Sequence, residues 1–272
     1  MEPRADPRNR EFLWTSPSGP RARLDDEQAR QWNESGYFLL RDAFTADEVE
    51  SITAEIDPIQ EQVSAFLGTR PGGKAFIAEQ GNIAFCPNLV LASRRLREFC
   101  AHRVFRELAH DLIGPDVRLY WEQAVYKYPE RPRRFPWHQD NGYTFVEPQQ
   151  YVTCWVALTD ATRENGCPWV APGFHLRGTL EHWMTGQGWQ CLEEPEGAIA
   201  VEAPAGSVVV FSSLTPHQTG PNTSGSVRKA YIVQLAPDGA VAFRQGDVPE
   251  RQDDPARQYP ILQRGSPVSV PA

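Results

Sequence analysis

The spacing of apolar residues changes near Gly114. Before this glycine, apolar residues recur every three or four positions, which is the spacing of amphipathic helices. After it, short segments rich in Val, Tyr, Trp and Phe are separated by clusters of Pro, Gly, Asn and Asp, which is typical of strands joined by turns. The pattern therefore predicts helices in the first part of the chain and sheets in the second.

Three helices are predicted before the change of period. The first covers residues 25–34 and is followed by a short strand at 37–41. The second begins at a capping box at 45–48 and should kink at Pro58. The third ends at Gly114, a residue type that favours helix C-termini. The apolar residues expected on the buried faces of the last two helices are Val49, Ile52, Ile56, Ile59, Val63, Phe66, Val104, Phe105, Leu108 and Leu112.

Short strands at fairly regular spacing fill the second part. They are predicted at residues 117–128, 152–158, 198–202, 207–212 and 228–236. Helices followed by such a series of strands favour a mainly β fold with flanking α-helices. The order indicates a β-sandwich or jelly roll with the N-terminal helices packed on one face, and of these two we expect the jelly roll, or double-stranded β-helix.

A single domain is expected over residues 24–272. Residues 1–23 contain four prolines and few apolar residues, which predicts a loosely ordered N-terminal arm. From about Gly239 the chain is polar and rich in proline, so an irregular surface tail is expected there.

The composition is that of a globular protein. Of the 272 residues, 40% are hydrophobic, 11% aromatic and 23% charged, which is enough apolar material for a sizeable core. No run of about 18 apolar residues and no signal peptide is visible, so neither a membrane span nor secretion is expected and the cytoplasm is the predicted location. The five cysteines are scattered without a CxxC pair, which indicates reduced packing residues rather than a disulfide framework.

The charge argues against nucleic acid as a partner. The net charge is −8, whereas binding of a phosphate backbone needs a basic surface. A basic stretch at residues 131–135 is a local exception, directly before the candidate metal motif. Two interpretations stay open for it, a solvated loop or a site that attracts an anionic group.

The strongest chemical signal is a pair of short motifs, PWHQD at residues 136–140 and TPHQT at 215–219. Side chains two residues apart on a strand point to the same face, so His138 and Asp140 can converge on one ion. A distant strand then supplies His217 as the third ligand. Two imidazoles and one carboxylate suit Fe(II), because they leave three positions of an octahedron for a bidentate cosubstrate and dioxygen.

A basic residue accompanies this triplet. Arg228 opens the strand that follows His217, and a bidentate guanidinium there could hold the distal carboxylate of a dicarboxylate whose other end chelates the iron. Taken alone, Arg228 could equally be a surface residue at a strand end. Only its company with the three metal-ligand candidates favours the binding role.

Five segments, in this order, resemble the phytanoyl-CoA dioxygenase family of 2-oxoglutarate oxygenases over most of residues 24–236. They are DDEQARQWNESGYFLLRDAFTADEV, WHQDNGY, VTCWVALTDATRENGCPWVAPGFH, AGSVVVFSSLTPHQTGPNTS and the strand opened by Arg228. The resemblance implies a dioxygenase that requires Fe(II) and 2-oxoglutarate, consumes dioxygen and oxidises a small-molecule substrate, most often by hydroxylation of a C–H bond.

The resemblance also implies roles for individual residues. His138, Asp140 and His217 match the iron ligands of the family. Arg228 matches the arginine that binds the distal carboxylate of 2-oxoglutarate, and Thr219 matches a hydroxyl that assists it.

Two further positions have weaker matches. Trp155 matches a tryptophan that lines the cosubstrate pocket, although core packing is an alternative for it. Gln123 resembles a residue that hydrogen-bonds the cosubstrate near the iron, with an outward-facing strand position as its alternative. His175 is expected to be a structural turn residue, and the segment 181–194 either a lid or a packed insertion.

Two other kinds of protein remain possible from sequence alone. One is a catalytically silent jelly roll that binds a metal or a ligand, and the other is a zinc metallohydrolase that uses the same three ligands. The substrate is open as well: an acyl thioester, an amino acid derivative or a natural product would each suit an aromatic, partly basic entrance. The residues expected at that entrance are Tyr143, Phe145, Trp169, Trp183, Trp189, Arg131, Arg133 and Arg134.

Overall fold

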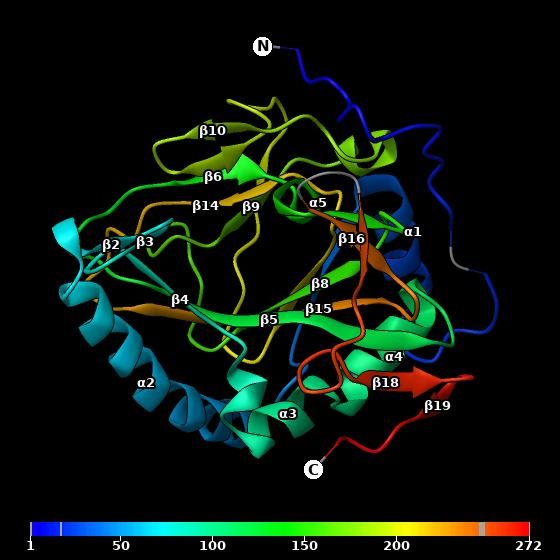
Figure 1. The fold of residues 1–272 in the computed structure, drawn as a ribbon, viewed down its shortest axis with the longest axis horizontal. Coiled ribbons are helices and arrows are strands. Elements are labelled where there is room, and N and C mark those ends of the chain that lie inside the picture. The colour runs from blue at the N-terminus through cyan, green and yellow to red at the C-terminus, as the bar shows by residue number, and fades with distance from the viewer. Residues whose placement is uncertain (1, 17, 245–247, 272) are drawn as a thin grey trace.

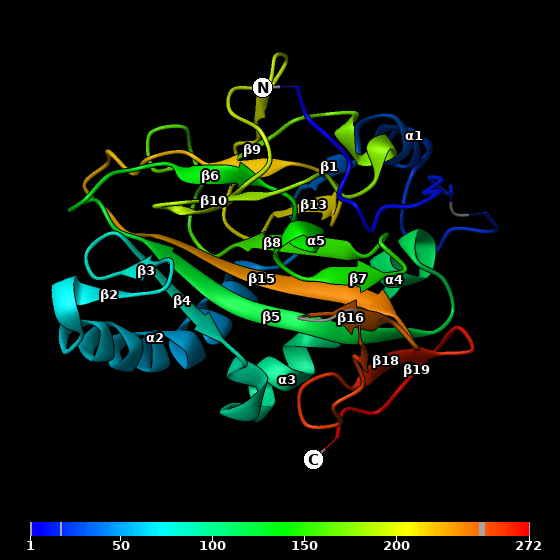
Figure 2. The same ribbon diagram turned by 45° about the horizontal axis from the view of Figure 1, so that its top comes forward.

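The computed structural model describes residues 2–16, 18–244 and 248–271. Its centre consists of two facing sheets (Figures 1 and 2). The larger sheet contains β1 (Tyr37–Leu40), β13 (Val208–Ser212), β8 (Val152–Ala157), β15 (Arg228–Pro237), β5 (Val117–Lys127), β4 (Ile83–Pro87), β3 (Ala78–Glu79) and β2 (Lys74–Ala75) in this order, and β18 (Pro260–Gln263) and β19 (Ser266–Pro267) extend it from β5. The smaller sheet contains β12 (Ile199–Ala200), β9 (Pro168–Val170), β14 (His217–Thr219) and β6 (Phe135–His138).

Two small antiparallel sheets complete the β-structure of the described residues. One is the hairpin β10 (Trp183–Thr185) with β11 (Gly188–Gln190), and the other joins β17 (Pro249–Arg251), β16 (Val241–Phe243) and β7 (Phe145–Glu147). All the strand pairs are antiparallel. The predicted double-stranded β-helix is therefore confirmed.

The helices α2 (Ala46–Gly68), α3 (Arg94–Cys100) and α4 (Arg103–Leu112) cover the face of the larger sheet that points away from the smaller one (Figure 2). The helical segments are α1 (Asp26–Ser35), α2 (Ala46–Gly68), η1 (Pro71–Gly73), η2 (Leu89–Leu91), α3 (Arg94–Cys100), α4 (Arg103–Leu112), α5 (Asp140–Tyr143) and η3 (Phe174–Arg177). The predicted capping box of α2 is present, with Thr45 and Glu48 each accepting from the other's backbone N–H. None of the described helices has the length and apolar character needed to cross a membrane.

The strands of the larger sheet are buried on both faces, which explains their nearly continuous apolar sequences. In β8, Cys154 and Val156 pack in the core beneath the helices, while Trp155 and Ala157 pack in the core between the two sheets. The same alternation of successive side chains places Arg228 of β15 on the inner face. On each of these strands, therefore, only every second side chain points into the space between the sheets.

One predicted core position of α2 is wrong. Phe66 is 52% exposed, and Leu67 is the buried residue at this end of the helix. The buried stripe passes through Gln60, whose amide donates a hydrogen bond to the hydroxyl of Tyr128. A stripe defined by apolar residues alone could not include a polar residue that is satisfied in the core.

The C-terminal tail is also different from the prediction. Instead of irregular structure after Gly239, the described part forms β16 to β19, and β18 adds to the edge of the larger sheet. Tyr259, Ile261 and Leu262 are buried in the core beneath the helices. Strands of two to four residues are too short to show a period in the sequence.

The N-terminal arm makes specific contacts, which were not expected of it. Ala5 forms a β-bridge with Leu180, and the backbone N–H of Asp6 donates to the carbonyl of Thr179 at 2.9 Å. The side chain of Asn9 donates to the carbonyls of Arg177 (2.8 Å) and Thr179 (3.1 Å). The arm is therefore attached to the segment just before hairpin β10–β11.

Candidate functional site

Three predicted metal ligands meet where β6 and β14 pair. His138 lies directly opposite His217 in the ladder, and their ring centroids are 4.2 Å apart. One oxygen of Asp140 lies 3.8 Å from Nε2 of His217. The ligand atoms of all three residues lie within 4.8 Å of one another, and no other His, Cys, Asp or Glu of the described residues joins the group.

The expected position of Asp140 on the same strand as His138 is wrong. β6 ends at His138, and Asp140 is the first residue of the short helix α5. The turn at Gln139 still brings the carboxylate back beside the imidazole, so the convergence predicted from the motif is present.

Each imidazole is held in one tautomer by its own backbone. Nδ1 of His138 lies 2.8 Å from the carbonyl of Pro136, and Nδ1 of His217 lies 3.1 Å from the carbonyl of Thr215. Because a carbonyl only accepts, each Nδ1 must carry the proton and donate. The lone pair of each Nε2 is then available to a metal, which is the usual arrangement around metal-binding histidines.

The carboxylate is oriented in a similar way. Oδ2 of Asp140 accepts a hydrogen bond from the hydroxyl of Thr153 at 2.5 Å, and the amide of Gln234 donates to the same hydroxyl at 3.3 Å. These contacts leave Oδ1 facing His217. Thr153 and Gln234 were not recognised in the sequence, because nothing in a strand sequence indicates which hydroxyl will meet a ligand.

Burial determines the protonation of the three side chains. It lowers the pKa of His138 to about 3, with a further lowering by His217, and it lowers the pKa of His217 to about 4. Burial also raises the pKa of Asp140. Both imidazoles are therefore neutral at pH 7, as coordination requires, and a divalent cation would relieve the cost of the buried carboxylate. A donor set of two nitrogens and one oxygen fits Fe(II), because three positions of an octahedron remain for other ligands.

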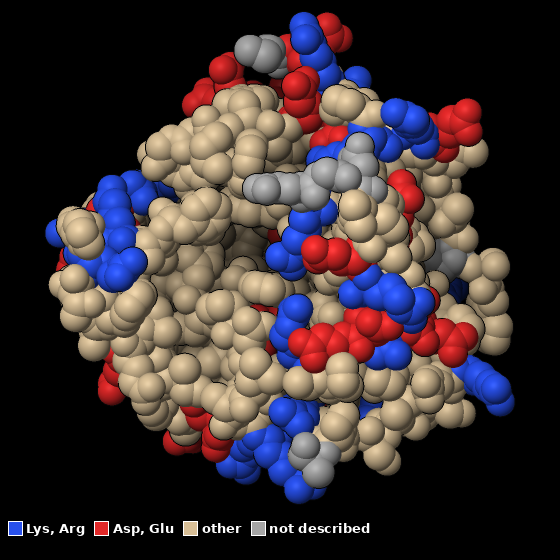
Figure 3. All heavy atoms as spheres, in the orientation of Figure 1, with Lys and Arg blue, Asp and Glu red and all other residues tan. Residues whose placement is uncertain are grey.

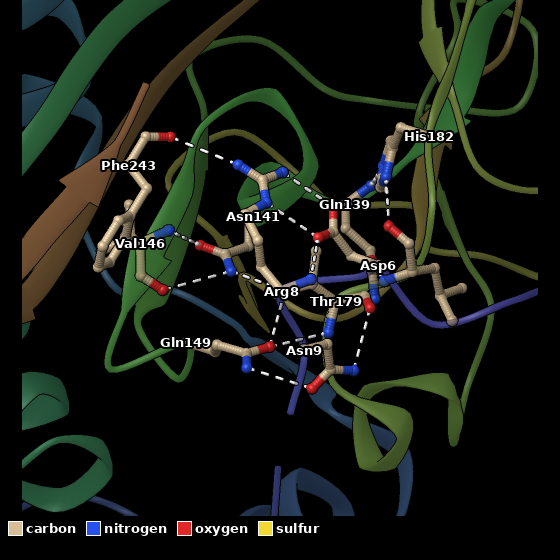
Figure 4. Close-up of polar contacts among 11 residues, drawn as sticks. Asp6, Arg8, Asn9, Gln139, Asn141, Val146, Gln149, Thr179, His182 and Phe243 are labelled. Carbon is tan, nitrogen blue, oxygen red and sulfur yellow. Dashed lines mark hydrogen bonds and ion pairs between the residues drawn. The ribbon is translucent and has the colours of Figure 1, made fainter. Parts of the chain in front are cut away.

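Gln139, between two of the candidate ligands, is fully buried and anchors them to the neighbouring loops. Its amide nitrogen donates to the carbonyls of Gly178 (3.0 Å) and Leu214 (2.6 Å), and its amide oxygen accepts from the backbone of Leu180 (2.6 Å). Its backbone N–H donates to Nε2 of His182 at 3.0 Å. Figure 4 shows Gln139 and His182 within this network. Gln139 therefore fixes the turn between His138 and Asp140.

Thr179 is the centre of the polar contacts in Figure 4. Its hydroxyl accepts a hydrogen bond from the side-chain amide of Asn141 (2.7 Å) and donates one to Gln149 (2.8 Å). Its carbonyl accepts from the backbone of Asp6 in the N-terminal arm. The arm is therefore connected through Thr179 to Asn141, the residue after Asp140.

Arg228 has the features of a buried anion-binding residue. It is fully buried, and burial lowers its pKa to about 10. Its guanidinium lies over the ring of Trp155 at 5.1 Å from the centroid, and Nη1 donates weakly to the carbonyl of Val125 at 3.4 Å. Within the described residues Nε and Nη2 have no hydrogen-bond partner. Unsatisfied buried donors of this kind fit a carboxylate such as the distal group of 2-oxoglutarate.

The other predicted cosubstrate residues lie on the inner surface. Thr219 is two residues beyond His217 on β14, and its hydroxyl accepts a hydrogen bond from Lys127 at 3.1 Å. Trp155 supports the guanidinium of Arg228 from the inner face of β8. Gln123 is on the same face of β5 as Val125, which packs between the sheets, so the outward-facing alternative is not what the structure has. Its contact with the cosubstrate stays a prediction.

The segment 181–194 borders the site. Its hairpin β10–β11 packs against β6, and the backbone N–H of Cys191 donates to the carbonyl of Trp137 at 2.8 Å. A Cβ at Gly188 would come within 3.0 Å of the hydroxyl of Tyr143, whose ring meets His138 edge-on at 5.2 Å. The hairpin therefore stands beside the candidate ligands.

The remaining predicted residues divide into those near the entrance and those in the core. Arg131 and Arg133 form ion pairs with Glu79 at 3.1 and 2.9 Å, so the basic stretch is partly neutralised, and Arg134 is exposed. Phe145 is buried, with its ring against the guanidinium of Arg8, and does not lie at an entrance. The face of the molecule that is turned to the viewer in Figure 1 has a hollow, and Lys and Arg side chains lie near the edge of this hollow (Figure 3).

His175 is structural, as expected. It is fully buried, and its Nε2 lies 3.1 Å from the carbonyl of Asn33. Trp14 packs against its ring with a centroid distance of 4.5 Å. It joins no metal-ligand cluster among the described residues.

Comparison with known protein families gives one match that covers most of the chain. The family model described as "Phytanoyl-CoA dioxygenase (PhyH)" matches residues 32–230. A phytanoyl-CoA dioxygenase of Arabidopsis thaliana is 26% identical over 169 residues, which are 60% of each protein. A methylphosphonate hydroxylase of Gimesia maris is 27% identical over 245 residues, which are 84% of each protein.

Solved structures with the same fold include a non-heme enzyme. It is the non-heme alpha ketoglutarate dependent carbocyclase SnoK from nogalamycin biosynthesis, with a TM-score of 0.67 and 25% identity. The superposition covers 93% of this chain and 97% of that one. The similarity extends over the N-terminal helices as well as the two sheets.

Proposed function

The chain belongs to the phytanoyl-CoA dioxygenase family of Fe(II)- and 2-oxoglutarate-dependent oxygenases, and on this basis we propose that it hydroxylates a C–H bond of a small-molecule substrate. The observation that carries the proposal is the convergence of His138, Asp140 and His217 in a buried site. The fully buried Arg228, with two unsatisfied donors, accompanies it. A catalytically silent protein that binds only a metal or only a ligand would have no need of both.

We assign the iron to His138, Asp140 and His217. When bound, the iron activates dioxygen for oxidation of the substrate at the expense of 2-oxoglutarate, which leaves as succinate and carbon dioxide. The protein contributes geometry: both imidazoles present Nε2, and Thr153 holds the carboxylate with one oxygen free. The zinc metallohydrolase alternative would require a general base beside a metal-bound water, and no other His, Asp or Glu of the described residues joins the cluster.

We assign the distal carboxylate of 2-oxoglutarate to Arg228 and Thr219. Trp155 stacks against the guanidinium and keeps it from turning, so its free donors stay fixed in direction. The opposite end of the cosubstrate then points to the iron. Gln123, which faces the same interior from β5, is the proposed hydrogen-bond partner near that end. Burial of these groups excludes water and strengthens each polar contact.

The substrate is expected to approach past hairpin β10–β11 and the aromatic residues around His138. Phe135 and Tyr143 both place their rings edge-on to His138, at 5.0 and 5.2 Å. Such surroundings suit a molecule with an apolar part, and the acyl thioester, amino acid derivative and natural product classes all fit. Hydroxylation is favoured because relatives named as dioxygenase and hydroxylase are similar over long stretches, although SnoK carries the name of a carbocyclase.

The decisive experiment is an anaerobic titration with Fe(II) and 2-oxoglutarate, followed by assays of succinate across a panel of compounds. We expect stoichiometric iron, saturable 2-oxoglutarate binding and substrate-dependent succinate. A product heavier than its substrate by one oxygen would support hydroxylation. Absence of 2-oxoglutarate binding in the iron-loaded protein would refute the proposal, and iron and cosubstrate binding without turnover on any compound would favour the silent alternative.

We also propose that the protein works in the cytoplasm. All five cysteines are free and buried, which suits a reducing compartment. Fluorescent tagging of the native protein in its own cells, combined with fractionation, tests this. Recovery in an oxidising compartment would contradict it.

A further inference from the structure

A second buried cation lies beside Arg228. Lys127 is the last residue of β5 and is directly opposite Arg228, the first residue of β15, in the antiparallel ladder. Residues paired in this way point to the same face of a sheet, and here it is the inner one. Lys127 is only 1% exposed, although lysine is among the residues most rarely found buried. No motif or local pattern distinguishes it from an ordinary lysine.

The ammonium of Lys127 is held against the end of β14. It donates to the hydroxyl of Thr219 at 3.1 Å and to the carbonyl of the same residue at 3.2 Å, and it also donates to the carbonyl of Gly220. A hydroxyl that accepts from an ammonium directs its own proton elsewhere. The Lys127 contact therefore leaves the proton of Thr219 free for an acceptor other than Lys127.

The two cations have no acid to neutralise them. Among the described residues neither Lys127 nor Arg228 forms an ion pair with a carboxylate, and the nearby Arg133 is already paired with Glu79. Burial and the proximity of Arg228 and Arg133 hold the pKa of Lys127 well below its usual range. Two adjacent buried cations are costly unless an anion compensates both.

We propose that Lys127 is a positioning residue for the distal carboxylate of 2-oxoglutarate, acting together with Arg228 through the hydroxyl of Thr219. The inference rests on the proposed function, because it presumes that the dicarboxylate binds between β15 and β14. Lys127 turns the hydroxyl of Thr219 toward the carboxylate and adds a second positive charge beside it. Succinate, which keeps that carboxylate, is held by the same group, so Lys127 also sets how tightly the product stays.

A purely structural role would have a different signature. If Lys127 only fastened Thr219 and Gly220 to β5, its loss would lower the thermal stability and would affect all ligands alike. As a positioning residue it affects ligands with a distal carboxylate and spares those without one. 2-Oxobutyrate has the same chelating end as 2-oxoglutarate and lacks the distal carboxylate, so it separates the two roles.

The experiment is calorimetric titration of the Fe(II)-loaded protein under anaerobic conditions with 2-oxoglutarate, succinate and 2-oxobutyrate. The variants are Lys127→Met, which removes charge and donor, and Lys127→Gln, which keeps a donor and carries the test if the first variant fails to fold. Lys229→Met is the matched control. Lys229 follows Arg228 in β15, so its side chain lies on the opposite face of the sheet, where it forms an ion pair with Asp57 at 2.8 Å. Circular dichroism and iron affinity establish that each variant is folded.

We expect Lys127→Met to weaken 2-oxoglutarate and succinate by about tenfold each, with 2-oxobutyrate within about twofold of the parent protein. In turnover, KM for 2-oxoglutarate should rise and kcat should stay within about twofold. Lys127→Gln should show a smaller loss, and Lys229→Met none. The double variant Lys127→Met with Thr219→Val should lose little more affinity for 2-oxoglutarate than the weaker-binding single variant. Both changes remove the same hydrogen-bonded pair of side chains.

Equal weakening of all three ligands, or no change for 2-oxoglutarate in a folded Lys127 variant, overturns the role of Lys127. The proposed function survives that result if Arg228→Leu still weakens 2-oxoglutarate. If the parent protein itself binds no 2-oxoglutarate, both proposals fail. Additive losses in the double variant overturn the action through Thr219.

Discussion

The imidazole of His182 lies directly against the backbone of Gly142. A Cβ atom at position 142 would come 2.0 Å from Cε1 of His182, so only glycine fits without displacing the ring. His182 also accepts a hydrogen bond from the backbone N–H of Gln139 at 3.0 Å. This contact therefore couples the turn after Asp140 to the residue between two proposed ligands.

Gly142→Ala should disturb the metal site without touching a ligand. The added methyl pushes His182 away and releases the N–H of Gln139, so we expect turnover to fall by about ten- to a hundredfold, as small displacements of reacting groups do. Overpacking should also lower the free energy of unfolding by about 1–3 kcal/mol. Succinate assays and urea unfolding measure both. Gly225→Ala is the control, because nothing lies within 4 Å of a Cβ there, and parent-like activity of Gly142→Ala would show that His182 is not needed in place.

Arg228→Leu should remove most of the affinity for 2-oxoglutarate. Loss of a charge-assisted contact of about 1.5–3 kcal/mol weakens binding by roughly ten- to a hundredfold. Iron should still bind, because within the described residues Arg228 forms no hydrogen bond or ion pair with any of the three candidate ligands. Anaerobic titration gives both constants. An unchanged 2-oxoglutarate affinity would refute the assignment of Arg228.

Single alanine substitutions should separate ligands from structural histidines. His138→Ala and His217→Ala are each expected to abolish iron-dependent turnover, because each removes one of the three proposed ligands. His175→Ala should keep its iron, since His175 contacts Asn33 and Trp14 instead. Metal analysis after dialysis is the measurement. Iron retained by His217→Ala but lost by His175→Ala would mean that the wrong distal ligand has been assigned.

Asp140 should direct the reaction toward oxygenation rather than halogenation. A carboxylate at this position neutralises part of the iron charge and occupies a place that chloride would otherwise take. Turnover of a known substrate in excess chloride should therefore yield oxygenated product by mass spectrometry. A dominant chlorinated product, or an Asp140→Ala variant with parent-like iron affinity and rate, would show that Asp140 is not a ligand.

A buried carboxyl far from the proposed ligands should make stability depend on pH. Glu122 is 2% exposed, where its oxygens accept from Tyr231 at 2.8 Å and from the backbone of Val90 at 3.2 Å. Burial raises the pKa of Glu122 to about 7 from an ordinary 4.5. Between these two values the unfolded chain loses its proton first, so this group reduces the free energy of unfolding as the pH rises.

Glu122→Gln should remove this dependence. Relative to the parent protein, the variant is expected to gain on the order of 3 kcal/mol between pH 4.5 and pH 7, because each unit of pKa difference corresponds to about 1.4 kcal/mol. The difference between the two proteins does not contain the contribution of the buried histidines, because both proteins have them. Their lowered pKa values make the free energy of unfolding rise with pH, which is opposite to the effect of Glu122. Urea unfolding at several pH values measures it. A parent-to-variant difference that does not change with pH would contradict the raised pKa.

The sequence predicted the structure correctly where a local pattern of residues is compatible with only one local conformation. The capping box at Thr45 and the long strand predicted at residues 117–128 follow from neighbouring residues alone. Both are present, the strand as Val117–Lys127. The meeting of His138 with His217 followed from motif chemistry before any pairing was known. The order of helices and strands indicated a sandwich or jelly roll, and the resemblance to a known family agrees with the jelly roll.

The contacts that the sequence did not predict are between residues far apart whose types are ordinary. Nothing about Lys127 distinguishes it from a surface lysine until β5 and β15 are aligned opposite each other. Gln139 looks like a spacer in its motif, yet it is fully buried and makes three side-chain hydrogen bonds to distant backbone. Such roles depend on strand register and loop packing, which no local pattern contains.

The docking of the N-terminal arm has a consequence for the order of folding. Asp6 bonds to Thr179, and Arg8 reaches the carbonyl of Phe243, which is 235 positions further along the chain. During synthesis the arm leaves the ribosome long before Thr179 and Phe243 do. Its contacts with them can form only after these distant segments have been made, because contacts of such sequence separation form late. The shell around the proposed iron ligands is thus completed by residues that are synthesised well before the partners they contact.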